Sequence, residues 1–241
     1  MKKLLAIGII VFLALLGTVI AKNVVAPPKF VPYQPPESQL TKIVLIRYAP
    51  GKGPSPACDN DGICEKKENS NNCPNDCPPE EPGTGCYDFL SGSMPKWNWV
   101  EDYYYESGLG STSNWATGKW NAVTSATIFG NGNSGTYHWG TYDYVNAIRY
   151  GDYPEAGVIA VTAIWYRGKN IYEYDIMFDT DYFPGSVDLD TISLHEFGHA
   201  AGLGDLYNVE CSDEVMYGYY TGVKHDLRQG DTTGIQLLYG A

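Results

Sequence analysis

The sequence predicts an α+β fold in which a twisted sheet carries helices on one face. Strand-like runs of apolar or alternating residues fill the middle of the chain, at 127–130, 146–150, 157–165 and 171–178. One helical pattern precedes them and another follows them, between Asp188 and Gly202. Grouped strands with helices segregated from them are typical of α+β domains.

The first helix is predicted at 113–124. Trp115, Ala116, Trp120 and Val123 recur there at helical spacing, so one face of the segment is apolar. Ser113 can cap the helix by accepting a hydrogen bond from a free backbone N–H. The second helix can begin at Asp188 or Asp190, each of which can act as its cap.

Residues 1–21 have the pattern of an export signal. Lys2 and Lys3 are followed by a run without charge, and Val19 and Ala21 fit a small-residue cleavage site. The sequence predicts a cleaved signal peptide, with an uncleaved N-terminal membrane anchor as the alternative. In both cases the rest of the chain is secreted or lies on the outer face of the cytoplasmic membrane.

The six cysteines agree with export, because an even number behind an export signal is typical of disulfides. Cys86 and Cys211 bracket the last part of the chain, and we predict that they pair. The other four predict a small disulfide module with a hinge at 58–85, since they lack the two Cys-x-x-Cys pairs of a zinc ribbon. The pairing within this module stays open among Cys58, Cys64, Cys73 and Cys77.

The proline-rich segment 22–57 is predicted to be an extended linker or a pro-segment. A strand-like run at 41–47 interrupts it, and this run either pairs with a sheet edge or belongs to a small pro-segment. Residues 86–241 follow as one domain, long enough to bury a core.

The formal net charge of −12 restricts the partners. An acidic surface keeps a protein soluble and argues against binding to nucleic acid. We expect a monomer that does not bind nucleic acid.

The run from His195 to Asp205 carries the chemistry. On a helix, His195 and His199 stand one turn apart on the same face, so both imidazoles can bind one metal ion. Glu196 is rotated away from them and can reach a water molecule beside the metal. Gly202 can end the helix with a positive φ, which lets Asp205 return toward the ion. Imidazoles and a carboxylate are ligands of zinc, so the sequence predicts a zinc site.

The third zinc ligand has alternatives. Asp231 is a second candidate carboxylate besides Asp205, whereas Glu210 and Glu214 lie too close to the motif to act as a downstream glutamate ligand. Two further histidines are predicted to be surface or packing residues, namely His138 and His225.

Two further segments extend the match to a known family. Met216-Tyr217 follows Asp205 and is itself followed by Gly218 and Tyr220, and the chain closes with Gly-Ile-Gln-Leu-Leu-Tyr-Gly at 234–240. Together with the zinc motif, these segments resemble the matrixins, a family of metzincin zinc peptidases. The resemblance covers about residues 86–241.

The sequence also departs from the matrixin pattern. Asp205 stands where matrixins have a third histidine, and Gly218 where their turn has a proline. The histidines that hold a second, structural zinc in matrixins are missing, so one zinc is expected. The propeptide motif Pro-Arg-Cys-Gly is missing too, so latency through a cysteine–zinc bond is not expected.

The resemblance implies a metzincin catalytic domain, with a mostly parallel sheet, an antiparallel edge strand, an active-site helix and a C-terminal helix. It implies that Met216 underlies the zinc in a Met-turn and that 157–165 is the edge strand along which a peptide extends. Asp179 and Asp181 fall in the acidic turn that carries calcium in matrixins, so structural Ca²⁺ is a further expectation. The implied substrate-binding residues are Gly157, Val158, Ile159, Ala160 and Tyr220.

The implied function is a zinc-dependent metalloendopeptidase that acts outside the cytoplasm on protein or peptide substrates. His195, His199 and Asp205 would hold Zn²⁺, and Glu196 would be the general base for the water that attacks the peptide bond. The alternative is an exported zinc-containing binding or surface-attachment protein without proteolytic activity. Glu196 favours the enzyme, because a structural zinc site has no use for an acid there.

Overall fold

The computed structural model describes residues 33–49, 52, 85–183, 185 and 187–241. The predicted export signal at 1–21 lies outside the described residues, as does the predicted cysteine module at 58–85 except for its last residue. A compact unit runs from Gln34 to Ala241. None of the helices described combines the length and apolar character that a membrane crossing requires.

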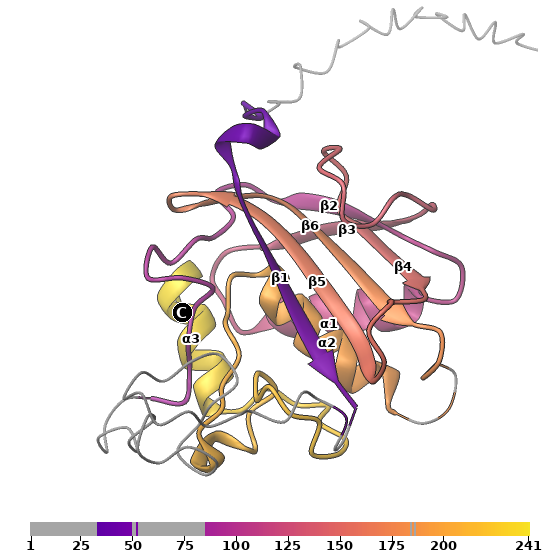
Figure 1. Cartoon of the computed structure of the whole chain (residues 1–241). Helices are drawn as coiled ribbons and strands as arrows, with labels where there is room; N and C mark the ends of the chain where they lie inside the picture. The colour runs from indigo at the N-terminus through magenta and orange to yellow at the C-terminus, as the bar shows by residue number, and fades with distance from the viewer. Residues whose placement is uncertain (1–32, 50–51, 53–84, 184, 186) are drawn as a thin grey trace, which may run out of the picture. The chain divides into compact units, whose positions relative to one another are not determined.

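One six-stranded twisted sheet forms a layer of this unit, with the strand order β1-β5-β6-β4-β2-β3 (Figure 1). β6, β4, β2 and β3 are parallel to one another, whereas β5 is antiparallel to both β6 and β1. The mostly parallel sheet with an antiparallel edge strand is therefore confirmed. The strands are β1 (Thr41–Tyr48), β2 (Glu101–Tyr105), β3 (Phe129–Ser134), β4 (Ala147–Gly151), β5 (Val158–Arg167) and β6 (Asn170–Asp179).

Two helices, α1 and α2, pack side by side against the sheet (Figure 1). Trp120 of α1 is fully buried, and its indole N–H donates a hydrogen bond to Leu194 O at 2.9 Å, which joins the two helices. Phe197 of α2 packs edge-on against Tyr103 and Phe129 of the sheet, with ring centroids 5.6 and 5.3 Å apart. The helices are α1 (Gly110–Ala122), α2 (Leu189–Ala200) and α3 (Gln229–Tyr239), with 3-10 turns at Glu37–Gln39 and Val209–Cys211.

Strand β5 is not at the edge of the sheet, so the expectation that 157–165 forms the edge is wrong. β1 pairs with it in antiparallel fashion, from Thr41 opposite Tyr166 to Tyr48 opposite Val158. Apolar side chains explain the pairing, because alternate residues of β1 reach opposite faces of the sheet. One face packs against the main core through Ile43 and Leu45, and the other packs against Val158, Val161 and Met177 through Ile46 and Tyr48.

A disulfide joins Cys86 to Cys211, with an S–S distance of 2.05 Å and Cα atoms 5.3 Å apart. This is the pair predicted from the sequence. Gly230 of α3 lies against the same point, because a Cβ at that position would overlap the backbone of Cys86. The start of the C-terminal domain is thus tied both to α3 and to the segment that precedes Met216.

Candidate metal centre

Helix α2 carries both histidines of the motif, and Asp188 caps its start. Asp188 Oδ1 accepts hydrogen bonds from Thr191 N at 2.8 Å and from Thr191 Oγ1 at 2.6 Å. The cap fixes the first turn of the helix, so His195 and His199 stand one turn apart on one face. These two imidazoles and the Glu196 carboxyl are each only 1% exposed.

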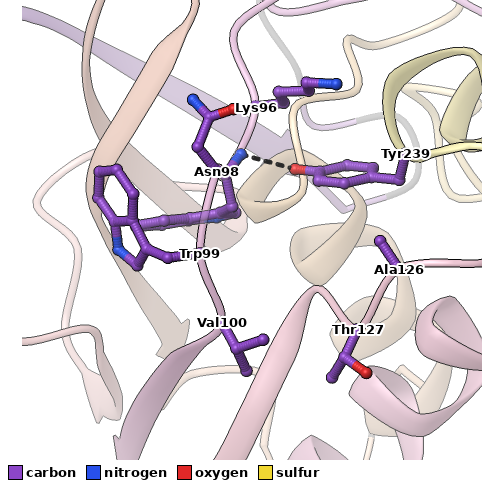
Figure 2. Close-up of a pocket in the computed structure, with 8 residues that line it drawn as sticks. Lys96, Asn98, Trp99, Val100, Ala126, Thr127 and Tyr239 are labelled. Carbon is purple, nitrogen blue, oxygen red and sulfur yellow. Dashed lines mark hydrogen bonds between the residues drawn. The ribbon is translucent and has the colours of Figure 1, made fainter. Parts of the chain in front are cut away.

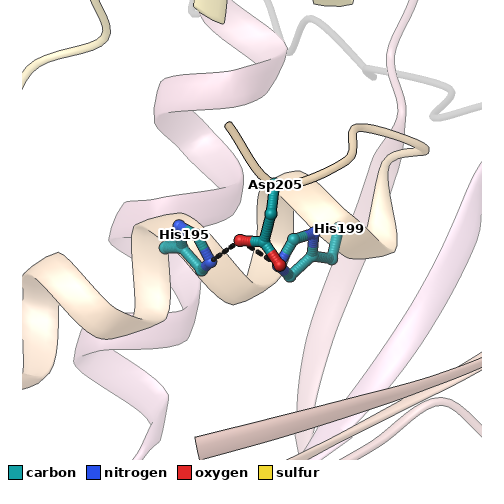
Figure 3. A group of neighbouring side chains, drawn as sticks. All are labelled: His195, His199 and Asp205. Carbon is teal, nitrogen blue, oxygen red and sulfur yellow. Dashed lines mark ion pairs between the residues drawn. The ribbon is translucent and has the colours of Figure 1, made fainter. Parts of the chain in front are cut away.

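Asp205 completes a cluster with the two imidazoles (Figure 3). Its Oδ1 lies 3.2 Å from His195 Nε2 and 3.5 Å from His199 Nε2. One ligand atom from each of the three residues lies within 4.8 Å of the other two. Among the residues described, no other group of three histidine, cysteine or acidic side chains meets at such distances.

The cluster fits a metal ion. His195 Nδ1 lies 2.8 Å from Val215 O, and His199 Nδ1 lies 3.0 Å from Leu203 O. A carbonyl oxygen only accepts, so both contacts favour a proton on Nδ1 and leave the Nε2 lone pair for a metal. His195 Nε2 is buried without a hydrogen-bond partner. The Nε2 atoms of two histidines beside a carboxylate form a set of ligand atoms that zinc accepts.

The turn after α2 brings Asp205 back to the histidines. Gly202 has φ of 111°, a conformation that favours glycine, and a Cβ there would overlap Pro95 O. Two backbone hydrogen bonds then fix the returning segment, from Leu206 N to Met216 O at 2.9 Å and from Gly218 N to Leu206 O at 2.8 Å. The Asp205 loop is therefore held against the turn that contains Met216.

Met216 lies in direct contact with the active-site helix. It is 1% exposed, and a Cβ at Gly198, one residue before His199, would overlap its Sδ. Asp231 of α3 accepts hydrogen bonds from Val215 N at 2.8 Å and from Met216 N at 3.0 Å. Asp231 therefore anchors this turn and is outside the metal cluster, in which Asp205 is the third side chain.

Glu196 points one carboxyl oxygen at the sheet. Its Oε2 accepts a hydrogen bond from Thr162 Oγ1 of β5 at 2.5 Å, whereas its Oε1 is buried without a partner. Burial raises the pKa of Glu196 above its ordinary value, although His199 and the Thr162 hydrogen bond act in the opposite direction. A carboxyl group with one fixed and one free oxygen, and a raised pKa, is suited to proton transfer.

The three side chains of the cluster differ in how their surroundings shift their pKa values. Burial, followed by the nearby Arg47 and His199, lowers the pKa of His195 to about 3, so this imidazole is neutral, as a metal ligand must be. Burial also acts against ionisation of Asp205, but His199 and His195 outweigh it and hold the pKa of Asp205 well below its usual range. The pKa of His199 is raised, because Asp205 outweighs the effect of burial there.

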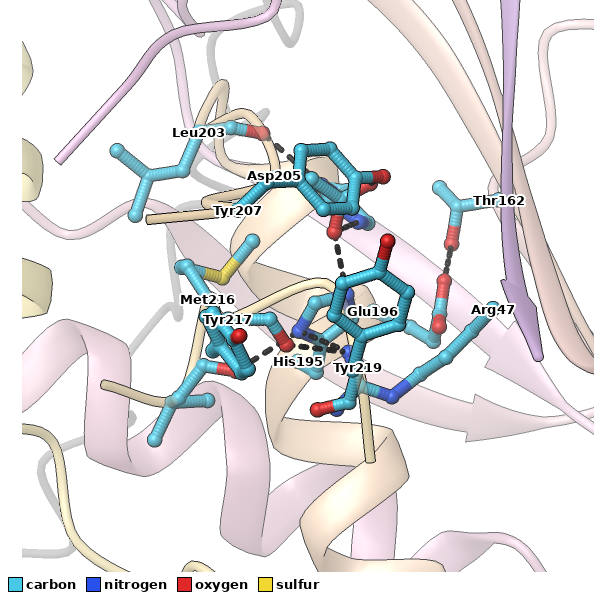
Figure 4. A network of polar contacts seen from close by, with 12 residues as sticks. Arg47, Thr162, His195, Glu196, Leu203, Asp205, Tyr207, Met216, Tyr217 and Tyr219 are labelled. Carbon is cyan, nitrogen blue, oxygen red and sulfur yellow. Dashed lines mark hydrogen bonds and ion pairs between the residues drawn. The ribbon is translucent and has the colours of Figure 1, made fainter. Parts of the chain in front are cut away.

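Three residues of the site were not predicted from the sequence, and Figure 4 shows them around the motif. Arg47 is 2% exposed and reaches from β1 to His195, with Nη1 2.7 Å from Nδ1. Tyr207 donates a hydrogen bond from its hydroxyl to Asp205 Oδ2 at 3.3 Å. Thr162 donates a hydrogen bond to Glu196 Oε2. The available signals were weak, namely a cation at the end of an apolar run, a tyrosine two residues after a ligand and a hydroxyl within an apolar strand.

The implied substrate-binding residues lie in two parts of the fold. Val158, Ile159 and Ala160 are buried in β5, where Val158 lies opposite Tyr48 and Ala160 opposite Arg47, and Gly157 precedes the strand with φ of 92°. The Tyr220 hydroxyl accepts a hydrogen bond from Asp188 N at 3.2 Å, so this side chain borders the start of α2. Their roles in binding substrate stay predictions.

The acidic turn after β6 is built from backbone contacts. Asp179 is buried and accepts hydrogen bonds from Tyr153 N and Asp181 N, both at 2.8 Å. Asp181 is exposed. Calcium binding by these two residues stays a prediction.

A separate pocket of about 440 Å³ lies between the segment before β2 and the end of α3 (Figure 2). Trp97 N donates to the Tyr239 hydroxyl at 2.9 Å beside it. None of the metal-cluster residues lines this pocket, and its lining consists of Lys96, Trp97, Asn98, Trp99, Val100, Ala126, Thr127 and Tyr239.

Comparison with known proteins agrees with this geometry. Residues 107–240 match the family model described as Matrixin. The chain is 32% identical over 111 residues to human matrix metalloproteinase-25. The aligned region covers 41% of this chain and 19% of that protein. It is 40% identical over 68 residues to metalloendoproteinase 2-MMP of Arabidopsis thaliana, which covers 26% of this chain and 17% of the relative. It is 43% identical over 54 residues to karilysin of Tannerella forsythia. That aligned region covers 22% of this chain and 11% of karilysin.

The matched regions thus span less than a fifth of these relatives' own lengths. The family model, by contrast, covers more than half of this chain and includes the cluster, the Met216 turn and α3. The chain therefore belongs to the matrixin family.

Proposed function

We propose that this chain is an extracytoplasmic zinc metalloendopeptidase that hydrolyses peptide bonds in proteins or peptides. The observation that carries the proposal is the position of Glu196 next to the ligand cluster. A buried carboxyl oxygen without a hydrogen-bond partner lies on the residue that follows His195, one of the two histidines of the cluster. Membership of the matrixin family supports the same reaction.

His195, His199 and Asp205 would hold the zinc. When bound, zinc polarises a carbonyl group and makes water more acidic. The hydrogen-bond contacts of these three residues with neighbouring groups support this role. Val215 O and Leu203 O fix the two imidazoles, and the Tyr207 hydroxyl fixes Asp205.

Glu196 would move the proton. Its free Oε1 accepts a proton from the attacking water and later donates it to the leaving amine, while Thr162 keeps Oε2 in place. Burial raises the pKa of Glu196 above its ordinary value, so its carboxyl group takes up a proton more readily than an exposed glutamate does.

The substrate would extend along β5. Because β1 is paired with β5, a peptide could add to the backbone N–H and C=O groups of β5 only in place of β1, with Gly157, Val158, Ile159 and Ala160 as the contact residues. Tyr220 would border the substrate from the side of the Met216 turn.

We also propose that the enzyme acts outside the cytoplasm, either secreted or attached to the membrane through its N-terminal segment. The export pattern at 1–21 and the Cys86–Cys211 disulfide support this location. The net charge of −12 supports substrates other than nucleic acid. We expect the enzyme to be a monomer.

The proposal is tested by measuring bound zinc together with digestion of a peptide library. We expect one zinc per chain, and cleavage by the wild-type chain or by its Arg47→Ala variant that a chelator abolishes and zinc restores. Glu196→Gln should retain the zinc and lose cleavage. Zinc binding without cleavage of any library peptide, in the wild-type chain and in the Arg47→Ala variant described below, would instead favour the non-proteolytic zinc protein.

A further inference from the structure

Strand β1 occupies the edge of the sheet that lies nearest the metal cluster. It pairs with β5 along its whole length, and Leu45 of β1 lies opposite Thr162, the residue that holds Glu196. Two residues further along, Arg47 lies opposite Ala160. A peptide cannot add to β5 while these backbone groups are already paired.

Arg47 reaches from β1 to His195 and to the segment that follows Met216 (Figure 4). Its Nη1 donates to Tyr217 O at 3.1 Å and also lies 2.7 Å from His195 Nδ1, and its Nη2 lies 3.5 Å from Tyr219 O. The side chain thus bridges the sheet and the segment that follows Met216. The carboxylates of Glu196 and Asp205 attract the guanidinium, whereas Lys224 on the same side of the site repels it.

The rest of β1 is held less firmly than the strands beside it. Arg47 is the one fully buried residue of β1, whereas β5 is buried over eight consecutive residues. Val44 is 38% exposed. The Arg47 anchor is itself incomplete, because its Nε is buried without a partner. As an edge strand, β1 can also leave by breaking its pairing with β5 alone.

We infer that the segment Thr41–Tyr48 is an internal competitor for the peptide-binding edge of β5, held there by Arg47, and that it must leave before a substrate can bind. This inference rests on the proposed function and adds its regulation. The blocking element is a β-strand with an arginine anchor. The chain is therefore latent in the form described, even though the residues of the cluster are already assembled.

A reversible covalent lock on β1 tests this inference. Val44 and Ala163 lie directly opposite each other in β1 and β5, so Val44→Cys with Ala163→Cys can join the two strands by a disulfide. The full-length chain also carries Glu196→Gln, so that a bound peptide is not cut. The probe is a fluorescent peptide with the sequence of residues 41–48, Thr-Lys-Ile-Val-Leu-Ile-Arg-Tyr.

We expect no binding of this peptide to the oxidised, locked chain and recovery of binding after mild reduction. In the chain without the lock, Arg47→Ala should raise the apparent affinity about tenfold or more, the effect of losing a charge-assisted hydrogen bond. The same peptide with alanine in place of its arginine should bind more weakly. The single variant Val44→Cys, exposed to the same reductant, controls for effects on the Cys86–Cys211 disulfide.

Equal peptide binding by the oxidised and reduced forms of the locked chain would overturn the inference, because β1 would then be a permanent strand. That comparison uses one protein in two states, so it holds even where Arg47→Ala fails to fold. The same series with Glu196 restored tests the proposed function separately. Lock-dependent peptide binding without cleavage would leave the inference standing and reject the peptidase.

Discussion

Nη1 of Arg47 lies 2.7 Å from Nδ1 of His195, the same nitrogen that lies 2.8 Å from Val215 O. A guanidinium only donates, so its contact requires a lone pair on Nδ1, whereas donation to Val215 requires a proton there. His195 can bind a metal through Nε2 only when Nδ1 carries the proton. The contact with Arg47 and metal ligation by His195 therefore oppose each other.

This opposition predicts that Arg47→Ala strengthens zinc binding. We expect an affinity about tenfold higher, as for the loss of one opposing charged contact. Competition with a chromophoric chelator measures it. Arg167→Ala is the matched control, because Arg167 is an exposed arginine of the same sheet that donates to Gln39 Oε1 at 2.8 Å. A similar gain in both variants would show that the effect is one of net charge alone.

Removing the acidic ligand should nearly abolish zinc binding. Asp205→Ala deletes one of three donors, so we expect a loss beyond the roughly 10- to 100-fold caused by changes around a ligand. Zinc content after dialysis is the measurement.

Asp231→Asn is the informative comparison for Asp205→Ala. Asp231 accepts hydrogen bonds from Val215 N and Met216 N and does not belong to the cluster. Its variant should lower the melting temperature while zinc content stays at one per chain. Loss of zinc only in the Asp231 variant would revive Asp231 as the ligand.

The hydroxyl of Thr162 should matter for rate and not for zinc. Thr162→Val keeps the branched shape in β5 but removes the hydrogen bond to Glu196 Oε2. We expect kcat to fall about tenfold, less than the roughly 10²- to 10⁴-fold associated with the loss of a general base in Glu196→Gln. Steady-state kinetics in the Arg47→Ala background, with zinc content measured in parallel, provide the test. An unchanged kcat would mean that Glu196 is positioned by other contacts.

Stability should fall as the pH rises. Burial, with the nearby Asp175, raises the pKa of Glu173 from 4.5 to about 9. Between these two values the folded chain retains a proton that the unfolded chain has lost, so the contribution of Glu173 to stability decreases with increasing pH. Melting temperatures at pH values from about 5 to about 9 should show this decline.

Glu173→Gln should flatten that decline. Glutamine keeps one oxygen for Asp143 N and Tyr144 N, both of which donate to Glu173 Oε2. A surface change such as Asp213→Asn should leave the slope as it is. If Glu173→Gln keeps the full slope, the dependence arises from other buried acids, Asp175 first among them.

Local spacing made the metal cluster predictable, because a helix fixes the relation between His195, Glu196 and His199 within a single turn. Gly202 can end this helix with a positive φ, so the return of Asp205 toward the histidines was predictable too. The role of Arg47 could not be predicted in the same way, since it depends on pairing between strands far apart in the sequence, Thr41–Tyr48 and Val158–Arg167. For the same reason the sequence alone does not show that 157–165 is covered by another strand.

Strand β2 was missed for a different reason. Its sequence begins with Glu101-Asp102 and continues with three tyrosines, which fit surface packing as well as a strand. The structure buries Tyr103 against Phe197 of α2 and against α1, where its hydroxyl donates to Asn114 Oδ1 at 2.7 Å. Tertiary contacts of this kind are not visible in the alternation of a five-residue segment.

The pairing of β1 with β5 also bears on how the protein is produced. A fragment that begins at Cys86 contains the whole metal cluster but lacks β1. It would present the bare edge of β5, a ten-residue apolar strand, to every other copy in solution. Such an edge is a template for intermolecular strand addition, so this fragment should aggregate during expression and refolding. A fragment that begins at Gln34 should stay dispersed.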